Sequence, residues 1–317
     1  MARAFVFPGQ GSQAVGMGVA LAEAFPVARQ VFEEVDDALD QHLSRLMAEG
    51  PEGDLTLTEN AQPAIMAASL AVTRVLESEG GFMLAEKGSY VAGHSLGEYS
   101  ALTAAGAFTL SDGARLLKRR GQAMQQAGEI SPGGMAAILG LDIPALEAVC
   151  LQASRPGEVV QVANDNCPGQ VVISGAEPAM QRALELARQA GAKRAVPLAV
   201  SIAAHSELMV PAQTQFNRAV IQAPLKNPDI PVVGNVSAAP LDSVQAIRED
   251  LNAQLTSRVR WTESMRWMIA QGITTFVEIG SGSVLTGLLR RIDRAVEGIS
   301  LGTPDDFEQL SARMSDG

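Results

Sequence analysis

The sequence predicts an α/β protein in which a small domain is inserted into a larger one. Short apolar segments are followed by glycine turns and helical patterns, which is typical of α/β architecture. Between residues 127 and 197 the predicted order changes to β-α-β-β-α-β. The length of 317 residues agrees with this division, because roughly 150 residues per domain gives about two domains.

The larger domain begins with a predicted strand at Ala4–Phe7, followed by a Pro-Gly-Gln-Gly-Ser-Gln loop. Apolar residues at helical spacing then run over residues 27–39, and Ala61–Leu76 is predicted as a second helix. Tyr90–Ala92 is a second strand candidate, and an Ala-rich helix runs on from Ser95. This strand, turn and helix pattern indicates α/β architecture.

The inserted domain is predicted from a regular series of short elements. Its strands are expected at Met135–Leu139, Val159–Ala163, Gln170–Ser174 and Arg194–Val196, and its helices at Pro144–Gln152 and Pro178–Ala190. This order is ferredoxin-like. We therefore expect residues 127–197 to form a ferredoxin-like insert, with residues 1–126 and 198–317 forming the domain around it.

The larger domain then resumes with a predicted strand at Pro231–Val236 and helices at Ser243–Leu255 and Thr262–Ala270. A buried strand at Thr274–Ile279 is followed by a Gly-Ser-Gly-Ser turn and a helix that runs to residue 292. Such a turn would cradle a phosphate in some proteins. No Gly-Lys-Ser/Thr follows here, so we interpret it as a structural turn.

Composition and charge exclude several classes of protein. With 47% hydrophobic and 19% charged residues, the chain is not an intrinsically disordered one. The net charge of −11 argues against broad nucleic-acid binding. Cys150 and Cys167 are too few for a disulfide framework or a zinc-finger set, and we interpret them as free thiols. Without a signal peptide or a long apolar run, we expect a cytoplasmic protein with no membrane or nucleic-acid partner.

The motif Gly-His-Ser-Leu-Gly at residues 93–97 matches G-x-S-x-G, placed between a predicted strand and a predicted helix. A sharp turn of this kind exposes the serine hydroxyl, and its glycines let the flanking backbone pack closely. The helix N-terminus offers free N–H groups, with that of Leu96 the natural first donor to an oxyanion. Ser95 is therefore the predicted nucleophile, and the alternative is a purely structural turn.

A serine nucleophile usually needs a general base, most often a histidine, and this chain has three. His42 belongs to a polar surface helix and is interpreted as solvated. His94 adjoins Ser95, so their side chains diverge and His94 is expected to pack under the turn. His205, in another loop, is the predicted base, the alternative being a loop-capping role. No acidic residue stands out as its partner, and a backbone carbonyl could take that place.

Together with the Phe-Pro-Gly-Gln-Gly-Ser-Gln loop, Arg120-Gly121, the segment Pro168–Gly175, Gln254-Leu255 and Glu278–Gly282, these motifs resemble the bacterial malonyl-CoA:acyl-carrier-protein transacylases of type II fatty acid synthesis. The resemblance covers essentially the whole chain in order. It implies an α/β-hydrolase-like core with a ferredoxin-like insert. It also implies an acyltransferase that works by a ping-pong mechanism.

The resemblance assigns roles to individual residues. Ser95 would attack malonyl-CoA while His205 takes its proton, and the phosphopantetheine thiol of acyl carrier protein would then accept the malonyl group. The backbone N–H groups of Gln10 and Leu96 would hold the oxyanion, and a backbone carbonyl near Gln254 would orient the base.

Arg120 is implied to grip the malonyl carboxylate with two parallel hydrogen bonds. Without the resemblance, the run of basic residues that contains Arg120 indicates a solvated helix face. The side chains of Gln10 and Gln254 would line the same pocket, and Asn164 is a further candidate for its wall.

The sequence departs from the family just before the base. Ala203-Ala204 precedes His205, whereas relatives usually carry Ser or a bulky Phe there. A smaller wall would admit a larger group such as methylmalonyl, unless neighbouring side chains compensate. Removing a few carbon atoms from a pocket wall changes the discrimination between two acyl substrates by only about 1–3 kcal/mol.

The expected partners are malonyl-CoA and acyl carrier protein, and we expect a monomer with no cofactor and no bound metal. Because carrier proteins are acidic, docking on a chain of charge −11 needs a local basic patch. Arg290, Arg291 and Arg294 are candidates, although they also fit a solvated helix end. The glycosylation pattern at Asn235-Val236-Ser237 is interpreted as irrelevant in the cytoplasm.

Other activities remain compatible with these motifs. The same chemistry would serve a polyketide synthase in trans or a malonate decarboxylase. A serine hydrolase or thioesterase would use water as the second nucleophile, but a hydrolase of neutral esters has no need of a buried guanidinium. A non-catalytic scaffold for carrier proteins would need none of Ser95, His205 and Arg120.

Overall fold

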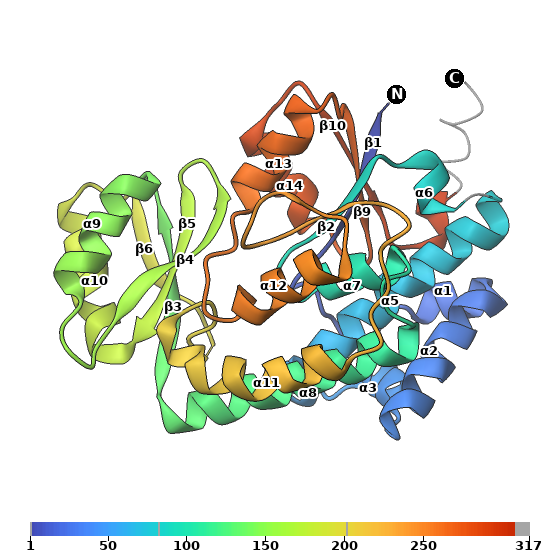
Figure 1. Cartoon of the computed structure of the whole chain (residues 1–317), viewed down its shortest axis with the longest axis horizontal. Helices are drawn as coiled ribbons and strands as arrows, with labels where there is room; N and C mark the ends of the chain where they lie inside the picture. The colour runs from blue at the N-terminus through green and yellow to red at the C-terminus, as the bar shows by residue number, and fades with distance from the viewer. Residues whose placement is uncertain (1, 82, 201, 308–317) are drawn as a thin grey trace.

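The computed structural model describes residues 2–81, 83–200 and 202–307, which form a larger and a smaller α/β unit side by side (Figure 1). The larger unit holds a six-stranded sheet of order β10-β9-β1-β2-β7-β8, parallel except for β8. Its strands are β1 (Arg3–Phe7), β2 (Tyr90–Gly93), β7 (Val232–Val233), β8 (Pro240–Leu241), β9 (Thr275–Ile279) and β10 (Glu297–Leu301).

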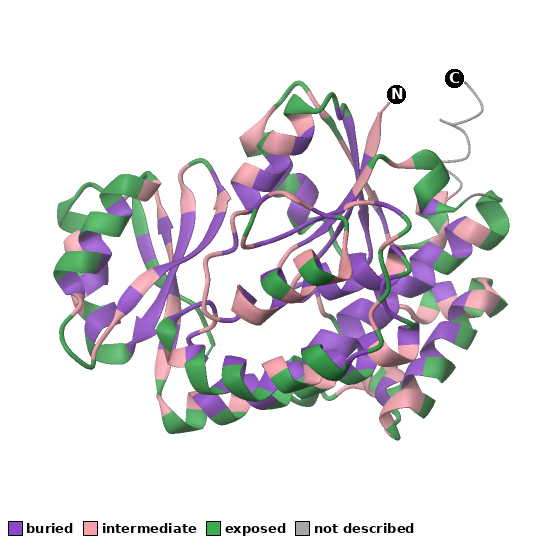
Figure 2. Cartoon of the chain, viewed as in Figure 1, coloured by how far each residue is buried: buried purple, intermediate pink, exposed green. Residues whose placement is uncertain are grey.

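Helices cover both faces of this sheet, as a parallel sheet requires. Alternate residues of β1 point to opposite faces: Phe5 and Phe7 join one hydrophobic core, and Ala4 and Val6 join another. The central strands and the long helix α5 are therefore mostly buried (Figure 2). The helices of this unit are α1 (Val19–Ala24), α2 (Pro26–Leu39), α3 (Leu43–Glu49), α4 (Glu52–Thr56), α5 (Thr58–Gly80), α6 (Leu84–Lys87), α7 (Gly97–Ala104), α8 (Leu110–Ile130), α11 (Val210–Gln222), α12 (Val244–Gln254), α13 (Trp261–Ala270) and α14 (Val284–Ile292), with a 3-10 turn η1 (Glu207–Met209).

The smaller unit is an antiparallel sheet of order β4-β5-β3-β6 with two helices packed against it. Its elements are β3 (Gly133–Leu139), α9 (Ile143–Ala153), β4 (Val160–Cys167), β5 (Gln170–Ala176), α10 (Glu177–Gln189) and β6 (Arg194–Pro197). The chain order β-α-β-β-α-β is the ferredoxin-like one. The predicted domain boundaries stay predictions, and the one at residue 127 falls inside α8.

Two segments differ from their predicted secondary structure. The strand expected at Pro231–Val236 is only two residues long, and the chain leaves the sheet at Gly234. The expected turn after Ala163 is instead the continuation of β4 to Cys167. Asn164 and Asp165 continue the strand because they pair with β5 and because Asp165 N–H donates to Val259 O at 2.9 Å. Long-range pairing thus outweighs the turn preference of Asn and Asp.

The turn at residues 280–283 is structural, as predicted. The carboxylate of Glu278, buried at the end of β9, accepts the N–H groups of Leu285 at 2.9 Å and Thr286 at 2.7 Å. These are free N–H groups of the first turn of α14, so a protein carboxylate already occupies the position that a phosphate would take. Within the described residues, no helix combines the length and the apolar composition needed to span a membrane.

Candidate active site

Ser95 lies at a sharp turn between β2 and α7, with a backbone φ of 54°. A non-glycine residue in this left-handed region is uncommon and needs support from its surroundings. The two flanking glycines allow the turn. A Cβ on Gly93 would lie 1.8 Å from Gly97 O, and a Cβ on Gly97 would lie 2.3 Å from Phe7 O. The spacing of the G-x-S-x-G motif is therefore required by close backbone packing.

Asn235 holds the turn in place from another part of the chain. Its Oδ1 accepts the N–H of Ser95 at 2.7 Å, and its Nδ2 donates to Gly93 O, also at 2.7 Å. The residue is 2% exposed. Asn235 reaches this position because β7 ends after two residues, so the early end of that strand places a side-chain amide under the nucleophile.

Ser95 and His205 form a hydrogen-bonded pair. Ser95 Oγ lies 2.8 Å from His205 Nε2. On the other side of the ring, Nδ1 faces the backbone oxygens of Gln254 at 2.9 Å and Ser257 at 3.2 Å. Carbonyl oxygens only accept, so Nδ1 carries the proton and Nε2 is free to accept the serine hydroxyl. The carbonyl that the resemblance implied for orienting the base is therefore present.

His205 is itself in the left-handed region, with φ of 58°, and is 2% exposed. Gln161 of β4 fixes its backbone, because Gln161 Nε2 donates to the carbonyl oxygens of His205 and Thr256, each at 3.3 Å. The smaller unit thus helps to hold the candidate base. Burial and the nearby positive charge of Arg120 lower the pKa of His205 to about 3.

The other two histidines lie where the sequence predicted. His42 is exposed at the start of α3. His94 turns away from Ser95: its Nε2 lies 2.8 Å from Asn166 Oδ1, and its ring meets the edge of Trp261. Burial lowers the pKa of His94, which favours its neutral form.

Arg120 lies against the nucleophile and is buried, with only 1% exposure. Its Nη2 donates to Ser95 Oγ at 3.1 Å and to Gln254 Oε1 at 2.9 Å, and its Nη1 donates to Gln62 Oε1 at 2.8 Å. These partners are neutral. The solvated helix face suggested by its neighbours is therefore wrong for Arg120, which the amphipathic helix α8 turns inward.

Gln254, at the end of α12, connects all three groups. Its backbone oxygen faces His205, its Oε1 accepts from Arg120, and its Nε2 donates to Ser95 O at 3.1 Å and to Glu98 Oε2. It is completely buried. Gln254 was predicted to line the pocket, and its contacts make it the central hydrogen-bonding residue of the site.

The predicted oxyanion donors belong to the Ser95 turn and to the loop that packs on it. Leu96 immediately precedes α7, and the Gln10 loop packs on the turn, since a Cβ on Gly9 would lie 2.7 Å from His94 O. Within the described chain, neither the Leu96 nor the Gln10 N–H donates to a protein acceptor. Asn164 is buried in β4, and its side chain makes no hydrogen bond to Ser95, His205 or Arg120 among the described residues.

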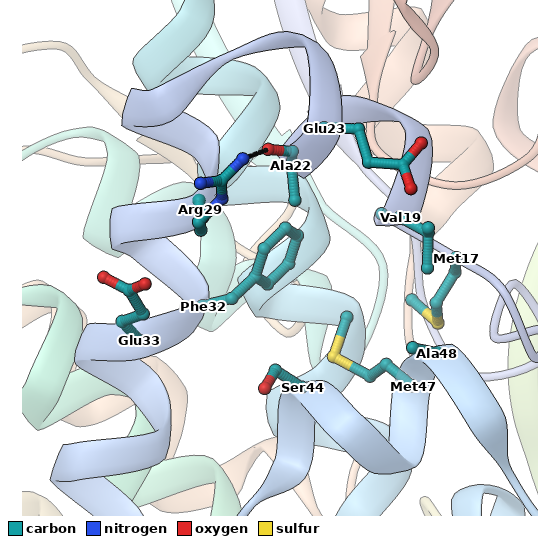
Figure 3. Close-up of a pocket in the computed structure, with 11 residues that line it drawn as sticks. Met17, Val19, Ala22, Glu23, Arg29, Phe32, Glu33, Ser44, Met47 and Ala48 are labelled. Atoms are coloured by element: carbon teal, nitrogen blue, oxygen red, sulfur yellow. Dashed lines mark hydrogen bonds between the residues drawn. The ribbon is translucent and has the colours of Figure 1, made fainter.

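Two cavities differ in their relation to this cluster. One of about 200 Å³ is bordered by Gln10, Met124, Ile202 and Ala204, so it opens beside the candidate base. The other, of about 290 Å³, lies among α1, α2 and α3 (Figure 3). Met17, Phe32 and Met47 form its apolar wall, and it contains no residue of the Ser95 cluster.

The low pKa of His205 predicts an unusual pH profile. The neutral imidazole is the form that accepts a proton, so modification of Ser95 by a neutral sulfonyl fluoride should keep its rate as the pH falls through 6.5. The rate should decline only toward the His205 pKa of about 3. Rate measurements across this range, with thermal unfolding recorded at each pH, test this.

The unfolded chain binds a proton at His205 near pH 6.5 and the folded chain does not, so His205 stabilises the fold fully above that pH and less as the pH falls toward 3. His205→Asn lacks this titration and serves as the control for the pH dependence of unfolding. A rate that halves near pH 6.5 while the protein is folded contradicts the prediction.

Sequence reasoning missed several residues of this cluster, namely Gln62, Glu98, Gln161, Asn166 and Asn235. Four of the five are amides, whose side chains are as common on surfaces as in sites. Glu98 directly follows the serine motif, and this adjacency was the one signal that could have found it.

Comparison with known proteins gives matches over nearly the whole chain. Residues 4–301 match the family model described as the acyl transferase domain. The chain is 46% identical over 305 residues to the malonyl CoA-acyl carrier protein transacylase of Bacillus subtilis, covering 96% of this chain and 95% of that protein. It is 42% identical over 301 residues to the Escherichia coli K12 protein of the same name, covering 95% and 96%.

Solved structures agree with the sequence comparison. The acyl-carrier-protein-S-malonyltransferase of Bartonella henselae superimposes with a TM-score of 0.95 at 49% identity, covering 99% of this chain and all of that one. A malonyl-transacylase solved in complex with a type II PKS acyl-carrier protein gives a TM-score of 0.94 at 41% identity, covering 99% and 100%. The predicted fold class, an α/β core with an inserted ferredoxin-like domain, is therefore confirmed: the core has a mostly parallel sheet and the small domain an antiparallel one. The chain belongs to the acyl transferase family and, within it, to the malonyl CoA-acyl carrier protein transacylases.

Proposed function

We propose that this enzyme transfers a malonyl group from malonyl-CoA to the phosphopantetheine thiol of acyl carrier protein, supplying fatty acid synthesis. The observation that carries this proposal is the buried guanidinium of Arg120, 3.1 Å from Ser95 Oγ. A buried cation beside a nucleophile suits an acyl group that ends in a carboxylate. The names of its full-length relatives support the same reaction.

In the first half-reaction, His205 Nε2 takes the hydroxyl proton as Ser95 Oγ attacks the thioester carbon. The backbone N–H groups of Leu96 and Gln10 would stabilise the tetrahedral oxyanion, because they belong to the Ser95 turn and to the loop packed on it and have no protein acceptor in the described chain. The carbon–sulfur bond then breaks, and His205 returns the proton to the departing CoA thiolate. Malonyl-Ser95 and free CoA are the products.

In the second half-reaction, the phosphopantetheine thiol gives its proton to His205 and attacks the ester carbon. The bond to Ser95 Oγ breaks, and the serine recovers its proton from His205. Gln10, Gln254 and Asn164 would line the pocket that holds the acyl group, and the cavity beside Gln10 and Ala204 would lead to it.

The finer expectations belong to the same proposal. The reaction needs no cofactor, because nucleophile, base, oxyanion donors and cation all come from this chain. The site is complete within one copy, which suits a monomer acting in the cytoplasm. Arg290 and Arg291, in the last turn of α14, are candidates for contact with the acidic carrier protein.

Intact-protein mass spectrometry tests the proposal directly. The protein is mixed briefly with malonyl-CoA, methylmalonyl-CoA and acetyl-CoA in competition, and carrier protein is then added. A malonyl adduct that carrier protein discharges much faster than water supports the transferase. Equal discharge by water favours a hydrolase or thioesterase, and a methylmalonyl adduct would show that the site accepts a larger acyl group, as Ala203 and Ala204 suggest.

A further inference from the structure

Glu98 is a buried acid that the reaction steps above do not use. It lies in the first turn of α7, three residues after Ser95, and has no exposed surface. One carboxyl oxygen, Oε2, accepts a hydrogen bond from Gln254 Nε2. The other, Oε1, has no hydrogen-bond partner in the described chain. An incompletely paired buried carboxyl destabilises a fold, so a role in the site would explain its presence.

The contacts of Gln254 depend on which way its amide points. With Nε2 toward Glu98 and Ser95 O, its Oε1 faces Arg120 and accepts from the guanidinium. The reverse orientation would place an NH₂ group against the Arg120 donors and an oxygen against the Ser95 carbonyl, which can only accept. Glu98 Oε2 supplies a second acceptor for Gln254 Nε2 and so supports the observed orientation.

Arg120 needs such neutral partners. No carboxylate lies within ion-pair distance of it in the part of the chain that the structure describes. Burial and the negative charge of Asp250 raise the pKa of Glu98 well above its ordinary value, which disfavours a negative charge on this nearby carboxyl. The positive charge of Arg120 therefore remains available for an anionic ligand.

We propose that Glu98 is a positioning residue for acyl-group selection: it holds the side-chain amide of Gln254 so that the amide oxygen orients the Arg120 guanidinium beside Ser95. Glu98 touches neither the acyl group nor the reacting atoms. The inference rests on the proposed function, because it assigns Arg120 the carboxylate of the acyl group.

Two variants of similar size separate this role from packing. Glu98→Gln keeps an acceptor for Gln254 Nε2, whereas Glu98→Met keeps the volume and removes the acceptor. The readout is the ratio of Ser95 acylation rates with malonyl-CoA and acetyl-CoA. Glu98→Met should lower this ratio by at least about tenfold, as expected for a misplaced charged hydrogen bond. Glu98→Gln should keep it within about twofold of the wild type.

Stability and a neutral reagent provide the controls. Glu98→Met removes both the unpaired Oε1 and the acceptor of Gln254 Nε2, so thermal unfolding is recorded to show that each variant is folded at the assay temperature. Modification of Ser95 by a neutral sulfonyl fluoride should also remain within about threefold, since the Ser95–His205 pair is retained.

An unchanged acylation ratio in Glu98→Met overturns the proposal, as does an equal loss in Glu98→Gln. Failure of the wild type to form any malonyl adduct would instead refute the proposed function. In that case the Glu98 proposal is refuted with it, but the sulfonyl fluoride reaction would still report on the serine pair.

Discussion

Ser95→Ala is expected to acquire no malonyl group from malonyl-CoA, and its turnover should fall by about four to six orders of magnitude. The hydroxyl is both the attacking atom and the link between His205 at 2.8 Å and Arg120 at 3.1 Å. Without Oγ, neither His205 nor Arg120 can hold the acyl group by a covalent bond. Intact-protein mass spectrometry after mixing with malonyl-CoA measures the loss.

Ser100→Ala is the matched control. Ser100 lies on α7, five residues after Ser95, and is equally a serine, but its Oγ is buried and has no hydrogen-bond partner in the described chain. This variant should form the adduct as the wild type does. A stable malonyl mass on Ser95→Ala would show that another residue is the nucleophile.

The parts of the site that could be predicted are those with a local signature. Ser95 was found because a strand, two glycines and a helix start lie within a few residues, and the close contacts at Gly93 and Gly97 explain why the spacing is fixed. His205 was found by elimination among three histidines.

The parts that could not be predicted depend on contacts between distant segments. Asn235 is 140 residues from Ser95, and its motif suggested only a glycosylation pattern. Asn166 was assigned to a turn, because the pairing of β4 with β5 and Val259 that extends the strand is not local. Gln62 is one of many amides in the sequence until α5 brings it to Arg120.

The same distinction applies to the fold. The buried strands β1 and β9 are mostly apolar and were predicted nearly to the residue. The edge strand β10 was missed, because four of its five residues are exposed or half-buried and it depends on pairing with β9.

Arg120→Ala is expected to reverse the preference between acyl groups. Acylation by malonyl-CoA should fall by about 30- to 1,000-fold, because the carboxylate loses its buried cationic partner. Acylation by acetyl-CoA should rise, for a reason that concerns the base: the Arg120 charge is the second largest cause of the lowered pKa of His205. Removing that charge makes His205 a stronger base for any acyl group.

Arg120→Lys separates these two effects. Lysine keeps a positive charge near His205 but cannot form two parallel hydrogen bonds to a carboxylate. It should therefore lose malonyl acylation without gaining acetyl acylation.

In the wild type, a bound malonyl carboxylate would offset the Arg120 charge and raise the pKa of His205, so the correct substrate would activate its own base. If Arg120→Ala keeps its malonyl preference, another residue binds the carboxylate. If Lys and Ala give the same rate with acetyl-CoA, Arg120 acts on substrate binding alone.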